Sequence, residues 1–200
     1  MPILLYKPTR LKCKGIIKIE AENISTGMIQ LGGPMVSIYP NTGISIENMG
    51  GVIFKGRCSI GNNSFISIAP TGTVVFGENF LATSSLKLVC YKKITFGKNV
   101  LVGWENLFCD TDFHAVKVRD TNEKKLAYAP INIGSNNWFA MKSIVMKGTK
   151  TSNYTIIGAN SFLSKDYSDL KEYSLIAGQP AKLVKENVYR DLSDDKIDYK

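Results

Sequence analysis

The phrase Ile60-Gly-Asn-Asn-Ser-Phe-Ile66 decides the fold, because four further copies of its pattern follow it along the chain. Each copy reads apolar-Gly-x-Asn-x-apolar-apolar, so its first and seventh residues are apolar. The other copies are Phe76-Gly-Glu-Asn-Phe-Leu-Ala82, Phe96-Gly-Lys-Asn-Val-Leu-Val102, Ile133-Gly-Ser-Asn-Asn-Trp-Phe139 and Ile157-Gly-Ala-Asn-Ser-Phe-Leu163. Glycine and asparagine are the residue types that most readily adopt left-handed backbone angles. The phrase is therefore interpreted as a backbone corner that is repeated.

An apolar residue at every sixth position matches neither a helical stripe nor simple strand alternation. It is typical of a solenoid, in which short strands end at bends and the inward residues of stacked coils bury one another. The phrases begin at residues 60, 76, 96, 133 and 157, and three hexads make a coil of roughly eighteen residues. The first two steps are therefore interpreted as about one coil each, and the third as about two coils' worth of chain that includes an excursion.

The excursion is predicted at residues 110–130, where the six-residue period is lost and charged residues increase. Such a segment is interpreted as a loop that protrudes from the solenoid. Residues 15–56 alternate β-forming residues with Gly and Asn, which predicts earlier, less regular coils. The expected organisation is an all-β single domain over residues 1–200, with coils over 15–165. A short polar tail, 166–200, helical or extended, caps the last coil.

The composition fits one domain with reduced cysteines and an anionic small-molecule partner. A chain of 200 residues with 44% hydrophobic residues buries a sizeable core. Its four cysteines are scattered, which favours core thiols over a disulfide framework or a zinc site. The net charge of +8 comes from dispersed basic residues. This pattern disfavours nucleic acid and suits a phosphate-bearing cofactor.

Two further features predict a cytoplasmic protein without an integral membrane segment. Basic residues interrupt the short apolar run near the N-terminus, so no stretch there has the length of a signal-peptide core. No apolar stretch elsewhere approaches the roughly 20 residues that span a bilayer.

Four motifs resemble those of a known family, the hexapeptide-repeat acyltransferases that form left-handed parallel β-helices. The similarity is strongest to the branch that acetylates sugars of bacterial surface polysaccharides, and it covers about residues 50–185. The motifs are Trp104 with Asp110-Thr-Asp-Phe-His114, Ile133-Gly-Ser-Asn-Asn-Trp138, Ile157-Gly-Ala-Asn-Ser161 followed by Lys165-Asp166, and Ile176-Ala-Gly-Gln-Pro-Ala-Lys182. The resemblance implies a left-handed parallel β-helix, acetyl-CoA as acyl donor, a sugar or glycan hydroxyl as acceptor, and a homotrimer with sites between subunits.

His114 is the single histidine of the sequence and matches the family's catalytic motif. Acyl transfer from a thioester needs a base for the incoming hydroxyl, and an imidazole is well suited to that task near neutral pH. Asp112 or Asp110 is expected to accept the ring's other N–H and fix its tautomer. The alternative for each aspartate is an ordinary loop cap. Trp104 is a candidate wall of the acceptor site, although a buried core position is an equal alternative.

Coenzyme A, as the resemblance implies, binds in a long groove between subunits along the late coils. Small residues at a corner let the pantetheine arm approach the backbone, and lysines suit the nucleotide phosphates. The candidate cofactor-binding residues are Trp138, Gly158, Ala159, Ser161, Lys165 and Lys182.

The sequence leaves alternatives to O-acetylation of a sugar, which fall into three classes. The first is N-acetylation of an amino sugar, and the second is a non-catalytic β-helix that serves as a scaffold or binding module. The third is a metal enzyme of the γ-class carbonic anhydrase type, which needs three histidines around one zinc ion. One histidine cannot supply them, so no metal is expected.

Overall fold

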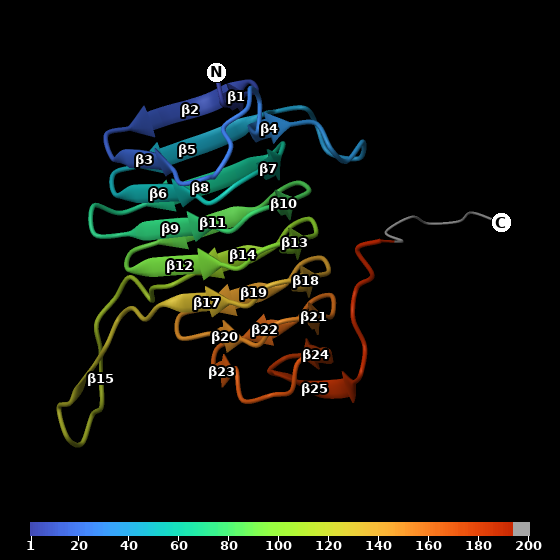
Figure 1. Ribbon diagram of the computed structural model, residues 1–200. Helices are drawn as coiled ribbons and strands as arrows, with labels where there is room; N and C mark the ends of the chain where they lie inside the picture. Colours follow the sequence, from blue (N-terminus) through green and yellow to red (C-terminus); the bar gives the residue numbers. More distant parts are fainter. Residues whose placement is uncertain (194–200) are drawn as a thin grey trace.

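The computed structural model describes residues 1–193 and consists of short strands stacked in three parallel sheets (Figure 1). Sheet A contains β1 (Ile3–Leu5), β4 (Ile29–Gly33), β7 (Cys58–Gly61), β10 (Phe80–Ala82), β13 (Leu101–Val102), β18 (Trp138–Phe139), β21 (Thr155–Ile157), β24 (Ser174–Gly178) and β25 (Ala181–Glu186). Sheet B contains β2 (Pro8–Cys13), β5 (Ile44–Asn48), β8 (Ser64–Ile68), β11 (Lys87–Cys90), β14 (Leu107–Cys109), β19 (Ile144–Met146) and β22 (Phe162–Leu163). Sheet C contains β3 (Ile16–Ile19), β6 (Gly51–Phe54), β9 (Thr73–Phe76), β12 (Lys93–Phe96), β17 (Ile131–Ile133), β20 (Lys150–Thr151) and β23 (Asp166–Tyr167).

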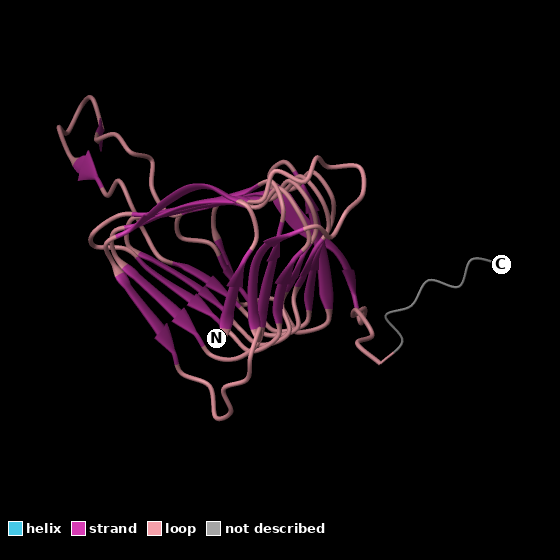
Figure 2. Cartoon of the chain, turned by 90° about the horizontal axis from the view of Figure 1, so that it is seen from above, coloured by secondary structure: helices cyan, strands magenta, loops and turns pink. Residues whose placement is uncertain are grey.

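The chain visits the sheets in the order A, B, C and builds seven coils. Viewed along the stack, the three sheets form the sides of a triangular prism (Figure 2). The architecture is a left-handed parallel β-helix. The coils were expected from residue 15, but the first coil already begins at Ile3 and includes β1 and β2.

The C-terminal end of the prism is closed by an antiparallel strand. β24 continues the parallel stack of sheet A, and β25 folds back on it with antiparallel pairing. Because β25 covers the open edge of sheet A, it serves as the cap that stacked repeats need. The expected tail of residues 166–200 thus begins with two strands, and its last seven residues, 194–200, lie outside the described residues.

The first and seventh residues of every phrase point into the prism, as the repeat predicts. Each of these ten residues is at most 7% exposed. Aromatic rings add a ladder along the core, in which Phe76 stacks between Phe54 and Phe96 with ring centroids 5.4 and 5.6 Å apart. Inward residues of successive coils therefore bury one another, and this burial is the main source of stability.

Glycine and asparagine perform different tasks in the phrase. All five asparagines at its fourth position have left-handed φ angles between 55° and 59°. The glycines at the second position are outside that region. They are required because neighbouring coils approach closely: a Cβ on Gly77 would lie 2.1 Å from the carbonyl oxygen of Gly97. Only the asparagine therefore uses the left-handed region.

The phrases mark two different corners of the prism. Those beginning at Phe76, Phe96 and Ile133 connect sheet C to sheet A, whereas those beginning at Ile60 and Ile157 connect sheet A to sheet B. The interpretation of the first step as one coil was therefore wrong, because residues 60 and 76 lie on two sides of the same coil. The step from 96 to 133 is one coil plus an excursion.

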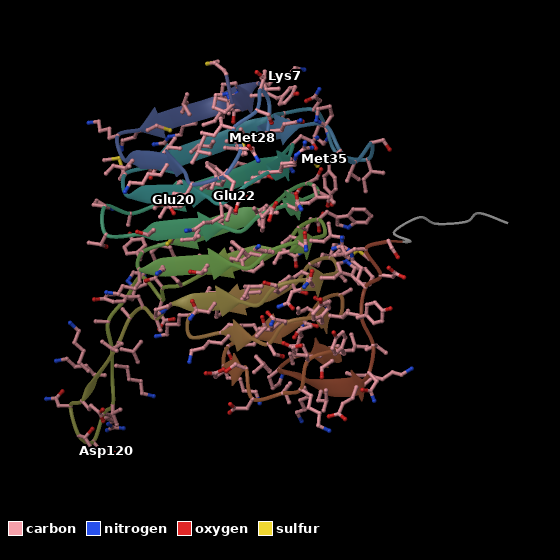
Figure 3. All side chains as sticks on the ribbon, in the orientation of Figure 1. Lys7, Glu20, Glu22, Met28, Met35 and Asp120 are labelled. Atoms are coloured by element: carbon pink, nitrogen blue, oxygen red, sulfur yellow. The ribbon has the colours of Figure 1, made fainter. Side chains whose placement is uncertain are left out.

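Each corner carries one excursion (Figure 2). Residues 20–28, the C–A strap, lead from β3 to β4, and residues 34–43, the A–B strap, lead from β4 to β5. Residues 110–130, the arm, leave the B–C corner between β14 and β17. The arm contains the antiparallel pair β15 (Val116–Lys117) and β16 (Lys124–Lys125), with Asp120 at its tip (Figure 3).

The outer surfaces of the three sheets differ in polarity along the late coils. Sheet A presents Leu101, Trp138 and Ile156 in register, and sheet B presents Leu107, Ile144 and Phe162. On the same coils, sheet C presents Asn132, Lys150 and Asp166. Along these coils, sheets A and B are therefore apolar on the outside, and sheet C is polar.

Candidate functional site

His114 lies at the base of the arm, where the arm leaves the B–C corner. A bridge between Thr111 and Tyr128 closes the base, and the backbone N–H of Asp112 donates to the carbonyl of Ala127 at 2.7 Å. His114 comes two residues after Asp112, the last paired residue of this base, and its side chain is exposed. The imidazole therefore faces solvent from a segment whose two strands are hydrogen-bonded to each other.

A tight turn at Phe113 sets the direction of His114. The N–H of His114 donates to the carbonyl of Asp112 at 2.7 Å, across a central residue with φ of 61°. This is the geometry of the γ-turn with positive φ, which is rare and strained, and a bulky residue there is a genuine outlier. The Phe113 ring packs edge-on against Tyr91, with centroids 5.4 Å apart. Strain of this kind persists where surrounding contacts hold it and is concentrated at functional sites.

Asp112 is fixed by a lysine from the next coil. Its carboxylate pairs with Lys147 Nζ at 2.5 Å, and the same ammonium donates to the carbonyl of Leu126 at 2.5 Å. Lys147 follows β19 and thus lies one coil below the arm. One ammonium group therefore contacts both strands of the arm's base.

Asp110 has a different task from the one expected. Its side chain is fully buried, and its two carboxylate oxygens accept the backbone N–H groups of Tyr91, Lys92 and Lys93 at 2.6 to 2.8 Å. These donors form the turn between β11 and β12 in the preceding coil. Asp110 is thus a cap that joins two coils, and the loop-cap alternative describes it.

The thiols beside Asp110 are shielded. Burial, followed by the charge of Asp110, raises the pKa of the Cys90 thiol, and burial also raises the pKa of Cys109. All four cysteines are free.

The two tryptophans lie away from His114 within one chain. Trp104 lies at the A–B corner, where its indole N–H donates to Met141 Sδ at 3.0 Å and its ring lies 6.4 Å from that of Tyr39. Trp138 lies on the outer surface of sheet A and pairs with Leu101 and Ile156. Neither is a core residue, since both are partly exposed.

The candidate cofactor residues fall into two groups. Gly158, Ala159 and Ser161 belong to the A–B corner of the last coil. Lys165 and Lys182 line one hollow of about 180 Å³ near the B–C corner. These two lysines, 17 positions apart in sequence, are brought together because β25 folds back across the end of the prism.

Ser161 is an internal residue. It is 1% exposed, and its hydroxyl donates to the carbonyl of Gly158 at 2.7 Å and accepts the N–H of Gly178 at 3.2 Å. Its side chain therefore stabilises the corner.

Sequence reasoning missed Lys147, Phe113 and Tyr91. Lys147 follows Met146 with no motif around it, and only the stacking of coils shows its partner. Phe113 could have been noticed because it directly precedes His114 in the motif Asp110-Thr-Asp-Phe-His114. Among residues 1–193, no cluster of histidine, cysteine or acidic side chains has a metal-binding arrangement, and no helix is long and apolar enough to cross a bilayer.

Comparisons with known proteins show which proteins this chain resembles in sequence and in fold. No family model matches the chain. It is 26% identical to an uncharacterized 24.8 kDa protein in the cps region of Klebsiella pneumoniae, over 92% of this chain and 82% of that protein. It is 25% identical to the galactoside O-acetyltransferase of Escherichia coli (strain K12), over 78% of this chain and 76% of that protein. In fold it is similar to the crystal structure of the polySia-specific acetyltransferase NeuO, with a TM-score of 0.57 and 18% identity over 92% of this chain and 75% of that one.

Fold and sequence together define a hexapeptide-repeat protein of the left-handed β-helix class. Within that class, the chain is similar in sequence to a galactoside O-acetyltransferase.

Proposed function

We propose that this protein transfers an acetyl group from acetyl-CoA to a hydroxyl group of a sugar or glycan precursor, with His114 as the general base. The observation that carries the proposal is the exposed imidazole on a strained turn of an arm anchored at both strands. The relationship to a galactoside O-acetyltransferase supports the acceptor class.

In the proposed reaction, one proton passes from the acceptor to His114 and then to the leaving thiolate. The imidazole takes the proton from the acceptor hydroxyl while the hydroxyl oxygen attacks the thioester carbonyl. When the carbon–sulfur bond breaks, the imidazolium returns the proton to the departing thiolate. Asp112 supports this step by holding the arm through Lys147. Lys165 and Lys182 are the proposed partners of the nucleotide phosphates because they share one hollow.

The proposed assembly is a homotrimer, and the surfaces of the prism support it. A ring of three identical prisms buries two sides of each and leaves the third in solvent. The apolar outer surfaces of sheets A and B, beside the polar surface of sheet C, fit that arrangement. The base of the arm also exposes apolar side chains, with Phe113 at 56% and Leu126 at 74%. A neighbouring subunit would cover them.

The trimer would complete the site. If sheet A of one subunit packs on sheet B of the next, the outer cleft between them is bounded by the B–C corner of one and the C–A corner of the other. The arm with His114 would then face the neighbour's sheet A, which carries Trp138. The free thiols and the use of acetyl-CoA fit a cytoplasmic enzyme.

The experiment measures thiol release from acetyl-CoA with methyl β-galactopyranoside, maltose, glucosamine and N-acetylglucosamine as acceptors. We expect His114→Ala to lower kcat by about 10²- to 10⁴-fold, whereas Asp120→Ala at the arm tip leaves it unchanged. Equal rates for His114→Ala and the unchanged protein would refute the role of His114. Mass spectrometry of the products distinguishes O- from N-acetylation. Inactivity of both proteins across the panel would favour the scaffold alternative.

A further inference from the structure

The C–A strap covers a polar cavity to which no function has been assigned above. The cavity has a volume of about 790 Å³ and lies between the strap and the C–A corners of the coils beneath it. Glu20, Glu22 and Met28 mark the course of the strap across this corner (Figure 3). Met28 is 7% exposed and accepts the N–H of Cys58 through its carbonyl, so it anchors the end of the strap. The strap is therefore tied to the prism at this end.

Two ion pairs hold the walls of the cavity. Lys55 Nζ lies 2.6 Å from Glu20 Oε2 on the strap side, and Lys98 Nζ lies 3.7 Å from Glu78 Oε2 on the corner side. The Asn79 side chain on the same wall donates to Asn99 at 3.1 Å. The wall therefore combines carboxylates, ammonium groups and amides, and neither sign of charge is in excess among these pairs.

Two charged side chains of the lining are available to a ligand. Within residues 1–193, the side chains of Arg57 and Glu22 have no hydrogen-bond or ion-pair partner, and both are exposed. A guanidinium offers a fixed fork of donors, and a carboxylate offers acceptors. Together they can bind a molecule that donates and accepts hydrogen bonds at neighbouring positions.

This combination matches the hydroxyl groups of a sugar ring. Each hydroxyl both donates and accepts, so a binding wall needs donors and acceptors in balance. A phosphate or nucleotide would instead need donors in excess. A cavity of this volume is within the range of small-molecule sites.

We propose that the cavity beneath the C–A strap binds the acceptor sugar, with Arg57 and Glu22 as its principal hydrogen-bonding groups. The proposal rests on the acetyl-transfer function and on the trimer described above. In that trimer the C–A corner of one subunit faces the B–C corner of the next, from which the arm with His114 projects. The cavity contacts the corners of β9 and β12, and the arm follows β14, so both lie on adjacent coils of the stack.

The test is a steady-state analysis of Arg57→Ala, Arg57→Lys and Glu22→Gln in the full-length protein. We expect Arg57→Ala and Glu22→Gln to raise the acceptor KM by about 10- to 100-fold, since each removes a charged hydrogen bond. The KM for acetyl-CoA and the slow hydrolysis of acetyl-CoA without acceptor should stay within twofold. Arg57→Lys should recover part of the loss, and Lys7→Ala, at the A–B corner between β1 and β2, is the charge-matched control. Thermal unfolding verifies that each variant is folded.

The outcomes separate the two proposals. Unchanged acceptor KM in both Arg57→Ala and Glu22→Gln would overturn the sugar site and leave the acetyl-transfer function intact. If the unchanged protein transfers no acetyl group, saturation-transfer NMR with methyl β-galactopyranoside tests the cavity directly. A signal that is lost in Arg57→Ala supports the site. A signal that survives, or no signal at millimolar sugar, refutes it.

Discussion

The carboxylate of Asp112 and the ammonium group of Lys147, 35 residues apart in sequence, form a 2.5 Å ion pair across two coils. Lys147 also donates to the carbonyl of Leu126, so a single side chain connects the solenoid to both strands of the arm. Lys147 is therefore a positioning residue for His114, which it does not contact.

Removal of this anchor should affect catalysis more than stability. We expect Lys147→Met to lower kcat by about 10- to 100-fold, because a misplacement of the base by about 1 Å has effects of that size. The free energy of unfolding should change by less than about 1 kcal/mol, since the pair is partly exposed. Lys147→Arg should restore part of the rate. Lys150→Met, which removes the neighbouring pair with Asp166, is the control, and a kcat within twofold for Lys147→Met would contradict the role.

Substitution of Asp110 should affect stability more than catalysis, which is the reverse of the result expected for Lys147. Asp110→Asn puts an amide where a carboxylate now accepts three backbone N–H groups, so we expect a loss of about 2–4 kcal/mol in the free energy of unfolding. Urea denaturation measures this loss. The rate per folded molecule should remain within a few-fold of the unchanged protein. Full stability together with a rate as low as that of His114→Ala would instead indicate an interaction with the imidazole.

Separate substitutions of the glycine and the asparagine of one phrase test their different roles in the corner. Gly77→Ala should destabilise the protein by about 1–3 kcal/mol, because its Cβ would clash with the neighbouring coil. Asn79→Ala should be milder, about 1 kcal/mol, since alanine disfavours the left-handed angle and loses only an exposed hydrogen bond to Asn99. Glu78→Ala, between them, serves as the control. If Gly77→Ala proved harmless in chemical denaturation, close packing of the coils at this corner would be refuted.

The cysteines should differ sharply in reactivity. Burial raises the pKa of the Cys58, Cys90 and Cys109 thiols, whereas Cys13 is exposed. Because the thiolate is the reactive form, a thiol-exchange reagent at pH 8 should modify Cys13 rapidly in the native protein. The other three should react only after denaturation. Rapid reaction of Cys13→Ser native protein would contradict the burial of those thiols.

The pair between Lys150 and Asp166 gives stability a specific pH dependence. Hydrogen bonds from Lys150 and then Ser168 lower the pKa of Asp166 to about 2. Since the folded value is below the unfolded one, the stabilisation is complete above about pH 4 and is lost as the pH falls toward 2. Both side chains are over two-fifths exposed, so the effect should stay below about 1 kcal/mol.

The measurement compares the urea unfolding of the unchanged protein and Asp166→Asn at pH 6, 4 and 3. The difference between them should narrow with falling pH. A constant difference over this range would show that the ion pair is not its source.

Local sequence pattern predicted the features that depend on neighbouring residues. The apolar ends of each phrase specified which side chains point inward, and glycine with asparagine specified a corner, although only the asparagine of each phrase is left-handed. The loss of the period marked the arm. His114 was proposed as the base from its residue type and motif, because the chemistry of an imidazole belongs to the residue itself.

The tertiary structure alone decided how one coil lies on another. The sequence did not distinguish the A–B corner of Ile60 from the C–A corner of Phe76, since both use the same phrase and the coils differ in length. The same uncertainty hid the partner of Lys147 and the capping role of Asp110. These contacts join residues 17 to 35 positions apart, and their pairing depends on the number of residues in each intervening side, corner and excursion.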